Sequence, residues 1–157
     1  MANRYWLFKS EPTAYSFADL MNEPEQTAEW DGVRNYQARN FLRDEVKEGD
    51  GVLFYHSSAD PTAVIGTAVV VRSGYPDHTA WDPDSDHPDP KSSPENPRWY
   101  MVDIKGEAAL PNPVTLAAIK ANPALGNISL ITRPRISVHP IAPEEWRIIR
   151  EMGQMGP

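Results

Sequence analysis

The chain has 157 residues, of which 40% are hydrophobic and 24% charged, a balance typical of one globular domain. It contains no cysteine, which excludes disulfides, thiolate catalysis and cysteine-based zinc sites. The net charge of −7 argues against non-specific binding to long nucleic acids, because such binding requires a basic surface. No apolar run is long enough to span a bilayer, and the first residues lack the apolar segment of a signal peptide. We therefore expect a cytoplasmic monomer that does not contact a membrane.

The first predicted element is a strand over residues 4–9, which are rich in aromatic side chains. Ser16, followed three residues later by Asp19, predicts the capped start of a short helix that ends at Pro24. Asn35 is a candidate N-cap for a second helix over residues 36–46, in which the apolar positions follow helical spacing.

A hairpin is predicted next, from strands at 52–56 and 63–71. Both strands are continuously apolar, which indicates burial on both faces. Gly66 interrupts the second strand and predicts a bulge or a close approach of the backbone to another element.

Residues 76–97 contain six of the 16 prolines, a density that no helix or central strand tolerates. Within residues 77–97, six acidic side chains and one lysine give a charge of −5. We expect a long acidic surface loop here, and we expect residues 82–97 to be dispensable for folding.

The remaining predicted elements are a strand over 98–104, a helix capped by Thr115, a short strand within 134–140, and a helix with Pro143 at its first position. Residues 152–157 are expected to form a flexible tail. The sequence therefore predicts a single domain over residues 1–151, with an α+β fold of five or six strands and short helices around them.

The sequence lacks the common catalytic and phosphate-binding patterns, namely a glycine-rich phosphate loop, GxGxxG, HExxH and GxSxG. Alternating aspartates at 82, 84 and 86 open a calcium-loop pattern, but its required glycine and glutamate positions hold His87 and Ser93. His56 and Ser57 are neighbours on a strand and would face opposite sides, which argues against a catalytic triad with Asp60. The four histidines share no helical face, so we predict no metal and no cofactor.

The aromatic residues suggest a binding function. Most of them are expected in the core, whereas Trp30 and Trp81 lie in turn or loop sequence beside Asp, Gly or Pro. We expect Trp30 to be a flat wall of a binding pocket rather than a core residue. Flat aromatic walls are suited to a flipped nucleobase, which is held by stacking and by hydrogen bonds to its edge.

Four segments together resemble the EVE domain. They are YWLFKSEP at 5–12, WDGVRNYQARNFLR at 30–43, GDGVLFYHS at 49–57 and RPRISV at 133–138. The resemblance implies a PUA-like mixed β pseudobarrel, related to the YTH and ASCH folds, and the non-catalytic binding of a modified base, with modified cytosine as the leading candidate. The implied partner is a DNA or RNA that carries the modified base, or a small base-like ligand. Transferred position by position, the resemblance implies a ligand site formed by Lys9, Ser10, Trp30, Gly32, Val33, Arg34, Asn35, Ser57 and, through a loop that aligns poorly, Trp81.

Several alternatives stay open. Asn35 could read a base edge or simply cap its helix, and Lys9 and Arg34 could contact a flanking phosphate. An ASCH-type nuclease or amidohydrolase would use Lys9, Glu11 and His56. A third possibility is a pocket for a free nucleotide-like metabolite, which the negative net charge favours.

Overall fold

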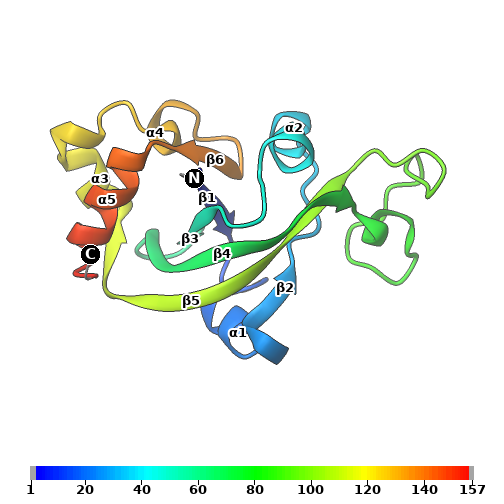
Figure 1. The fold of residues 1–157 in the computed structure, drawn as a ribbon, viewed down its shortest axis with the longest axis horizontal. Coiled ribbons are helices and arrows are strands. Elements are labelled where there is room, and N and C mark those ends of the chain that lie inside the picture. The colour runs from blue at the N-terminus through cyan, green and yellow to red at the C-terminus, as the bar shows by residue number, and fades with distance from the viewer. Residues whose placement is uncertain (1–2, 156–157) are drawn as a thin grey trace.

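A single mixed sheet organises the protein. The computed structural model describes residues 3–155, and its six strands follow the order β2-β5-β4-β3-β1-β6. Strand β1 (Tyr5–Ser10) runs parallel to β3 (Gly51–His56), whereas the other paired strands are antiparallel. The prediction of an α+β fold with a mixed sheet of five or six strands and short surrounding helices is confirmed (Figure 1).

The other strands are β2 (Thr27–Glu29), β4 (Ala63–Pro76), β5 (Tyr100–Thr115) and β6 (Val138–Ile141). The helices are α1 (Phe17–Met21), α2 (Tyr36–Asp44), α3 (Leu116–Ala121), α4 (Ser129–Thr132) and α5 (Pro143–Met152), with 3-10 turns η1 (Pro24–Gln26), η2 (His78–Trp81) and η3 (Pro123–Leu125). Figure 1 shows α3, α4 and α5 gathered at one end of the long β4–β5 pair. The loop that follows η2 extends from the other end.

The local helix signals are confirmed. Ser16 and Asp19 form a reciprocal capping box at the start of α1. The Asn35 side chain accepts a hydrogen bond from the Ala38 amide at 2.9 Å and caps α2, which ends two residues before the predicted end. Pro143 begins α5.

Strands β2, β4 and β5 differ from the prediction, and β4 extends to Pro76 instead of ending at residue 71. The three-residue β2 was not predicted, because TAE is too short to show an alternating pattern. Strand β5 continues to Thr115 through Pro111 and Pro113, although proline removes a ladder donor. This is tolerated because β2 pairs only with residues 103–105, so the remainder of β5 is an edge.

Alternate side chains of the central strands enter two cores. Phe8 and Phe54 belong to the core beside α1 and α2, whereas Leu7 and Leu53 belong to the core beside α3 and α5. All four side chains are fully buried, as predicted for the 52–56 strand. Gly66 lies at a shift of register, and a Cβ atom there would collide with the Phe17 ring, which confirms the predicted close approach.

The acidic loop is more closely tied to the domain than we expected. Ser92 is buried and accepts a hydrogen bond from the Arg98 amide, and Asp89 accepts one from the Trp99 indole at 2.6 Å. These bonds attach the loop to the domain through side chains, and the dispensability of residues 82–97 for folding stays a prediction.

The expected tail over 152–157 begins inside α5, and residues 156–157 lie outside the described part of the chain. Gly153 is buried, and its carbonyl accepts a hydrogen bond from the Asn112 amide at 3.1 Å. The Met155 amide donates to the Arg150 carbonyl at 2.9 Å. These contacts attach residues 153–155 to the domain.

Candidate functional site

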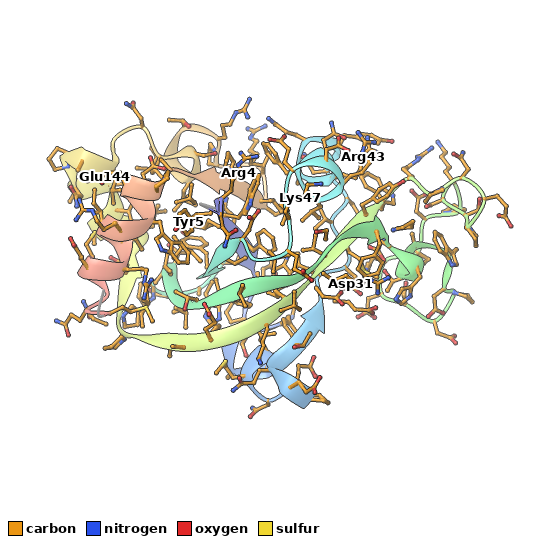
Figure 2. The ribbon with its side chains drawn as sticks, viewed as in Figure 1. Arg4, Tyr5, Asp31, Arg43, Lys47 and Glu144 are labelled. Carbon is orange, nitrogen blue, oxygen red and sulfur yellow. The ribbon has the colours of Figure 1, made fainter. Side chains whose placement is uncertain are left out.

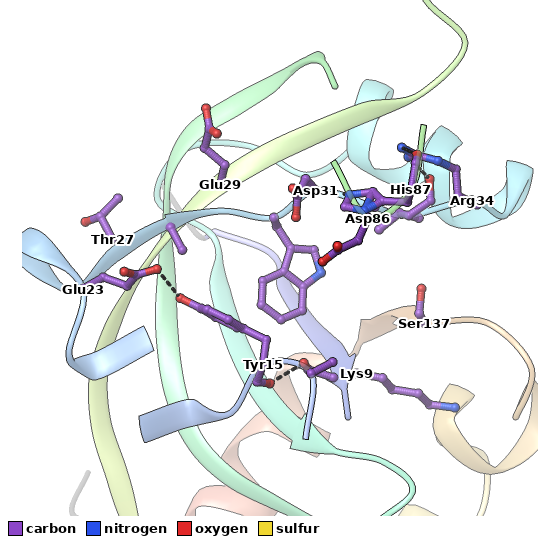
Figure 3. A pocket seen from close by; sticks show the side chains of 16 residues that line it. Lys9, Tyr15, Glu23, Thr27, Glu29, Asp31, Arg34, Asp86, His87 and Ser137 are labelled. Carbon is purple, nitrogen blue, oxygen red and sulfur yellow. Dashed lines mark hydrogen bonds and ion pairs between the residues drawn. The ribbon is translucent and has the colours of Figure 1, made fainter. Parts of the chain in front are cut away.

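A cavity of about 740 Å³ lies where β1, β2, the segment 30–34 and the acidic loop meet. This volume is in the usual range of small-molecule sites. Figure 3 shows the side chains around it. The cavity is lined by Lys9, Ser10, Ala14, Tyr15, Glu23, Thr27, Ala28, Glu29, Trp30, Asp31, Gly32, Val33, Arg34, Asp86, His87 and Ser137.

Trp30 is both a cavity wall and a core residue. Its ring lies 5.4 Å, between centroids, from Phe8 and from Phe54, and only 8% of the residue is exposed. The expectation that Trp30 is not a core residue is therefore wrong. Its backbone amide donates to the Val102 carbonyl at 2.7 Å, which fixes the chain just beyond β2 and brings the indole against the other aromatic rings.

Gly32 allows the acidic loop to approach the cavity. Its φ of +78° favours glycine, and a Cβ atom would lie 2.8 Å from the Nε2 atom of His87. The Gly32 amide donates to the carboxylate of Asp77 at 2.9 Å. A side chain at this position would force His87 out of the cavity wall.

Asp77 and Arg34 connect the two segments electrostatically. Asp77 is fully buried, and its carboxylate lies 3.0 Å from the Arg34 guanidinium. Burial raises the pKa of Asp77, but hydrogen bonds from Thr79, Gly32 and Arg34 outweigh burial and hold that pKa below its usual range. Arg34 also donates to the His87 carbonyl at 2.8 Å, so its guanidinium is committed within the protein.

Asp31 and Asp86 bring carboxylates to the same side of the cavity, next to His87 (Figure 3). The Asp31 carboxylate lies 3.4 Å from His87 Nε2. Burial, aided by the charge of Asp77, raises the pKa of Asp31. Asp31 is thus an anion that receives little stabilisation from the protein.

Lys9 and Ser137 lie on another side of the cavity in Figure 3. The Lys9 ammonium donates to the Pro134 carbonyl at 2.7 Å, and burial lowers the pKa of Lys9.

Tyr15 donates to Glu23 at 2.9 Å, and the Ser10 hydroxyl donates to the Tyr15 carbonyl. These bonds hold the segment that follows β1 against the cavity.

Of the residues implied by the family resemblance, six line the cavity: Lys9, Ser10, Trp30, Gly32, Val33 and Arg34. The other three have different positions among the described residues. Asn35 caps α2, and Ser57 follows β3, where its amide donates to the Ser10 carbonyl at 3.0 Å. Trp81 is half-buried at the end of η2, outside the cavity lining.

Most of the polar residues that line the cavity were not predicted from the sequence. Asp31 lies inside the segment WDGVRNYQARNFLR, but the family resemblance implies only its neighbours Trp30, Gly32, Val33, Arg34 and Asn35. Asp86 and His87 come from the acidic loop, more than 50 residues further along the chain, and no local pattern indicates that the loop returns to residues 31–34. The other polar residues missed are Tyr15, Glu23, Thr27, Glu29 and Ser137.

The three side chains of the alternative enzyme do not converge. Lys9 lines the cavity, whereas Glu11 and His56 are not among its lining residues. His56 Nε2 accepts a hydrogen bond from the Phe17 amide at 3.0 Å, which occupies the lone pair that a general base would need. Glu11 contacts the Ser58 hydroxyl at 3.5 Å.

Basic side chains surround α2 rather than the carboxylate side of the cavity. Figure 2 shows Arg4, Arg43 and Lys47 near that helix and Asp31 apart from them. Arg4 and Arg43 pair with Glu45 and Asp44, so their charges are locally compensated. The expected phosphate contact by Arg34 would require it to leave Asp77, which makes Arg34 a poor candidate.

Within residues 3–155, no group of three or more His, Asp or Glu side chains is placed to hold a metal ion. None of the helices in this range is long and apolar enough to cross a bilayer.

Comparison with known proteins places the chain in a family. The sequence model of the EVE domain matches residues 4–152. Human thymocyte nuclear protein 1 is 38% identical over 170 residues, which cover 98% of this chain and 75% of the human protein. A relative from the fission yeast Schizosaccharomyces pombe is 37% identical and covers 96% of this chain and 69% of its own length.

Solved structures have the same fold. A crystal structure of the human THYN1 protein in complex with DNA containing 5-methylcytosine has a TM-score of 0.91 and 38% identity, and the match covers 99% of this chain and 100% of that one. The YTH domain of Zygosaccharomyces rouxii MRB1, in complex with N6-methyladenosine RNA, has a TM-score of 0.55, 14% identity and coverage of 97% and 87%. The second match shows the fold alone.

Proposed function

We propose that this chain, which belongs to the EVE domain family, binds a modified nucleobase of a DNA or RNA strand in the cavity beside Trp30, without turning it over. The observation that carries the proposal is the combination of an indole wall with polar side chains around a cavity of about 740 Å³. Proteins hold a flipped base in this way, by stacking on its face and hydrogen bonding to its edge.

A methylated cytosine is the first base to test. The human THYN1 protein, which is 38% identical over almost the whole of this chain, has been crystallised in complex with DNA that contains 5-methylcytosine. In this chain we place the proposed base site beside the segment 30–34, because that segment supplies five residues to the cavity lining.

Binding without catalysis is the second part of the proposal. The geometry of Lys9, Glu11 and His56 favours it, because these groups do not share the cavity and His56 already accepts a hydrogen bond from Phe17. The partner is proposed to be a nucleic-acid strand rather than a free metabolite.

The experiment that tests the proposal follows the five indole N–H signals of the tryptophans by NMR during titration with a single-stranded oligonucleotide containing one 5-methylcytosine. The Trp30 signal, assigned from the spectrum of a Trp30→Phe variant, should shift. The Trp146 signal should not shift, because Trp146 lies on α5, where its ring stacks on Tyr5, and it does not line the cavity. A titration that moves other signals but leaves Trp30 unmoved would place binding elsewhere.

A further inference from the structure

The hydrogen-bond donors beside Trp30 on the carboxylate side of the cavity are already used by the protein. The Arg34 guanidinium donates to Asp77 and to the carbonyls of Val33 and His87. The Gly32 amide also donates to Asp77. A ligand on this side therefore meets few free donors.

The carboxylates on the same side are open. Within residues 3–155, the Asp31 carboxylate accepts a hydrogen bond only from its own backbone amide and lies 3.4 Å from Nε2 of His87. About 38% of the Asp31 side chain is exposed. Asp86, also among the lining residues, makes no hydrogen bond or ion pair in the described part of the chain. A partly desolvated carboxylate without good donors is stabilised when a ligand brings N–H groups to it.

The other side of the cavity has the opposite character. Lys9 uses one of its three N–H groups on the Pro134 carbonyl, which leaves donors available beside Ser137. Figure 3 shows Lys9 and Ser137 apart from Asp31 and Asp86. The cavity thus presents acceptors at one end and donors at the other.

This polarity distinguishes two bases that have the same methyl group. Cytosine carries an amino group, a donor, where thymine carries the O4 carbonyl, an acceptor. Both bases carry a carbonyl at C2. A cytosine with its amino group at Asp31 directs its C2 carbonyl toward the donors of the Lys9 side, whereas thymine in the same position places O4 against a carboxylate.

We propose that Asp31 determines the base specificity of the cavity by accepting a hydrogen bond from the exocyclic amino group of the base, so that 5-methylcytosine binds and thymine is rejected. The inference rests on the proposed function and deepens it, because it names the residue and the edge of the base that are read. Asp86 adds a second acceptor from the acidic loop. A site built around such a hydrogen bond disfavours a ligand that lacks the donor, because the partly desolvated carboxylate is then left without a partner.

The test compares two single-stranded oligonucleotides that differ only in one 5-methylcytosine or thymine. The wild-type protein should bind the first about ten- to a hundredfold more tightly, as expected for one hydrogen bond to a charged acceptor. In Asp31→Asn the side chain offers a donor as well as an acceptor, so the ratio of the two affinities should fall by about tenfold or more. Asp84→Asn is the matched control, since it removes one charge from the same acidic surface at an exposed residue outside the cavity lining, and it should keep the wild-type ratio.

A third oligonucleotide carries 5,N4,N4-trimethylcytosine, which keeps the ring but lacks both amino hydrogens. It tests the inference on the unaltered protein, and it should bind as weakly as thymine. Equal wild-type affinity for 5-methylcytosine and thymine would overturn the inference while leaving base binding intact, and so would an unchanged ratio in folded Asp31→Asn. If the wild-type protein binds none of the oligonucleotides, the proposed function fails and this inference fails with it.

Discussion

The Arg34 guanidinium donates to the fully buried carboxylate of Asp77 at 3.0 Å, and this pair attaches the acidic loop to the segment that forms the cavity wall. The same carboxylate accepts from the Gly32 amide and from Thr79. One buried side chain therefore orients both the loop and the cavity residues 32 and 34. Although residues 77–97 carry a charge of −5, this loop packs against the domain through Asp77 and Asp89.

Asp77→Asn should destabilise the protein by about 1–3 kcal/mol at neutral pH, because the amide cannot satisfy all of these donors. The pKa of Asp77 is lowered on folding, so the stability that its charge contributes is present above the unfolded pKa, about 3.9, and is lost as pH falls below it. Urea midpoints of the wild type and the variant should therefore converge at low pH. Equal midpoints at pH 7 would show that Asp77 does not attach the loop, and Asp84→Asn provides the charge control.

Trp30→Ala should lower both stability and base binding, because Trp30 serves the core and the cavity. Truncation of a buried tryptophan costs about 3–5 kcal/mol of unfolding free energy, and the loss of one stacked base costs about 1–3 kcal/mol of binding. Trp30→Phe keeps a ring against Phe8 and Phe54 and should lose much less stability while still weakening binding. Urea denaturation and oligonucleotide titration on the same two variants check this. Unchanged binding in folded Trp30→Phe and Trp30→Ala would remove Trp30 from the site.

His139 should make the protein sensitive to mild acid. It is fully buried, its Nδ1 lies 2.7 Å from the Ser129 hydroxyl, and burial, with the charges of Lys9 and Arg133, lowers its pKa to about 4. Because the folded pKa lies below the unfolded value of about 6.5, stability should be lost as pH falls from about 6.5 to about 4, by up to about 3 kcal/mol. His139→Gln should lack this part of the pH dependence. Parallel stability curves for the two proteins over that range would contradict the assignment.

Binding to an oligonucleotide should depend only weakly on salt. Arg34 is committed to Asp77, whereas Lys9 lines the cavity and has no carboxylate partner among the described residues. Arg39, on α2 outside the cavity lining, is the second candidate. The slope of log affinity against log salt should correspond to about two or three phosphates. A slope typical of a strongly basic protein would point to an extended binding surface instead of a cavity.

Local signals in the sequence were sufficient where a single segment determines the structure. Ser16 with Asp19, Asn35 and Pro143 each mark a helix start, because capping involves residues only a few positions apart. The apolar pattern of residues 52–56 likewise predicted burial on both faces of β3. The family resemblance then indicated which segment lines the cavity.

Contacts between distant segments were not predictable in this way. The approach of His87 to Gly32 depends on Asp77, and the three-residue β2 forms only because β5 offers its edge. The neighbours Asp31 and Gly32 predict a turn at Trp30, yet its backbone bond to Val102 turns the indole into the core. In each case the deciding partner lies more than 40 residues away in the chain.

The most direct test of base binding is the affinity of the wild-type protein for two single-stranded oligonucleotides that are identical except for one cytosine, which is methylated at C5 in one of them. Fluorescence anisotropy at a single salt concentration near 0.15 M measures both affinities on the same protein. We expect tighter binding of the methylated strand by roughly fivefold, since one buried methyl group contributes about 1 kcal/mol. Equal affinities for the two strands, or binding to neither, would contradict the claim that this cavity holds a modified base.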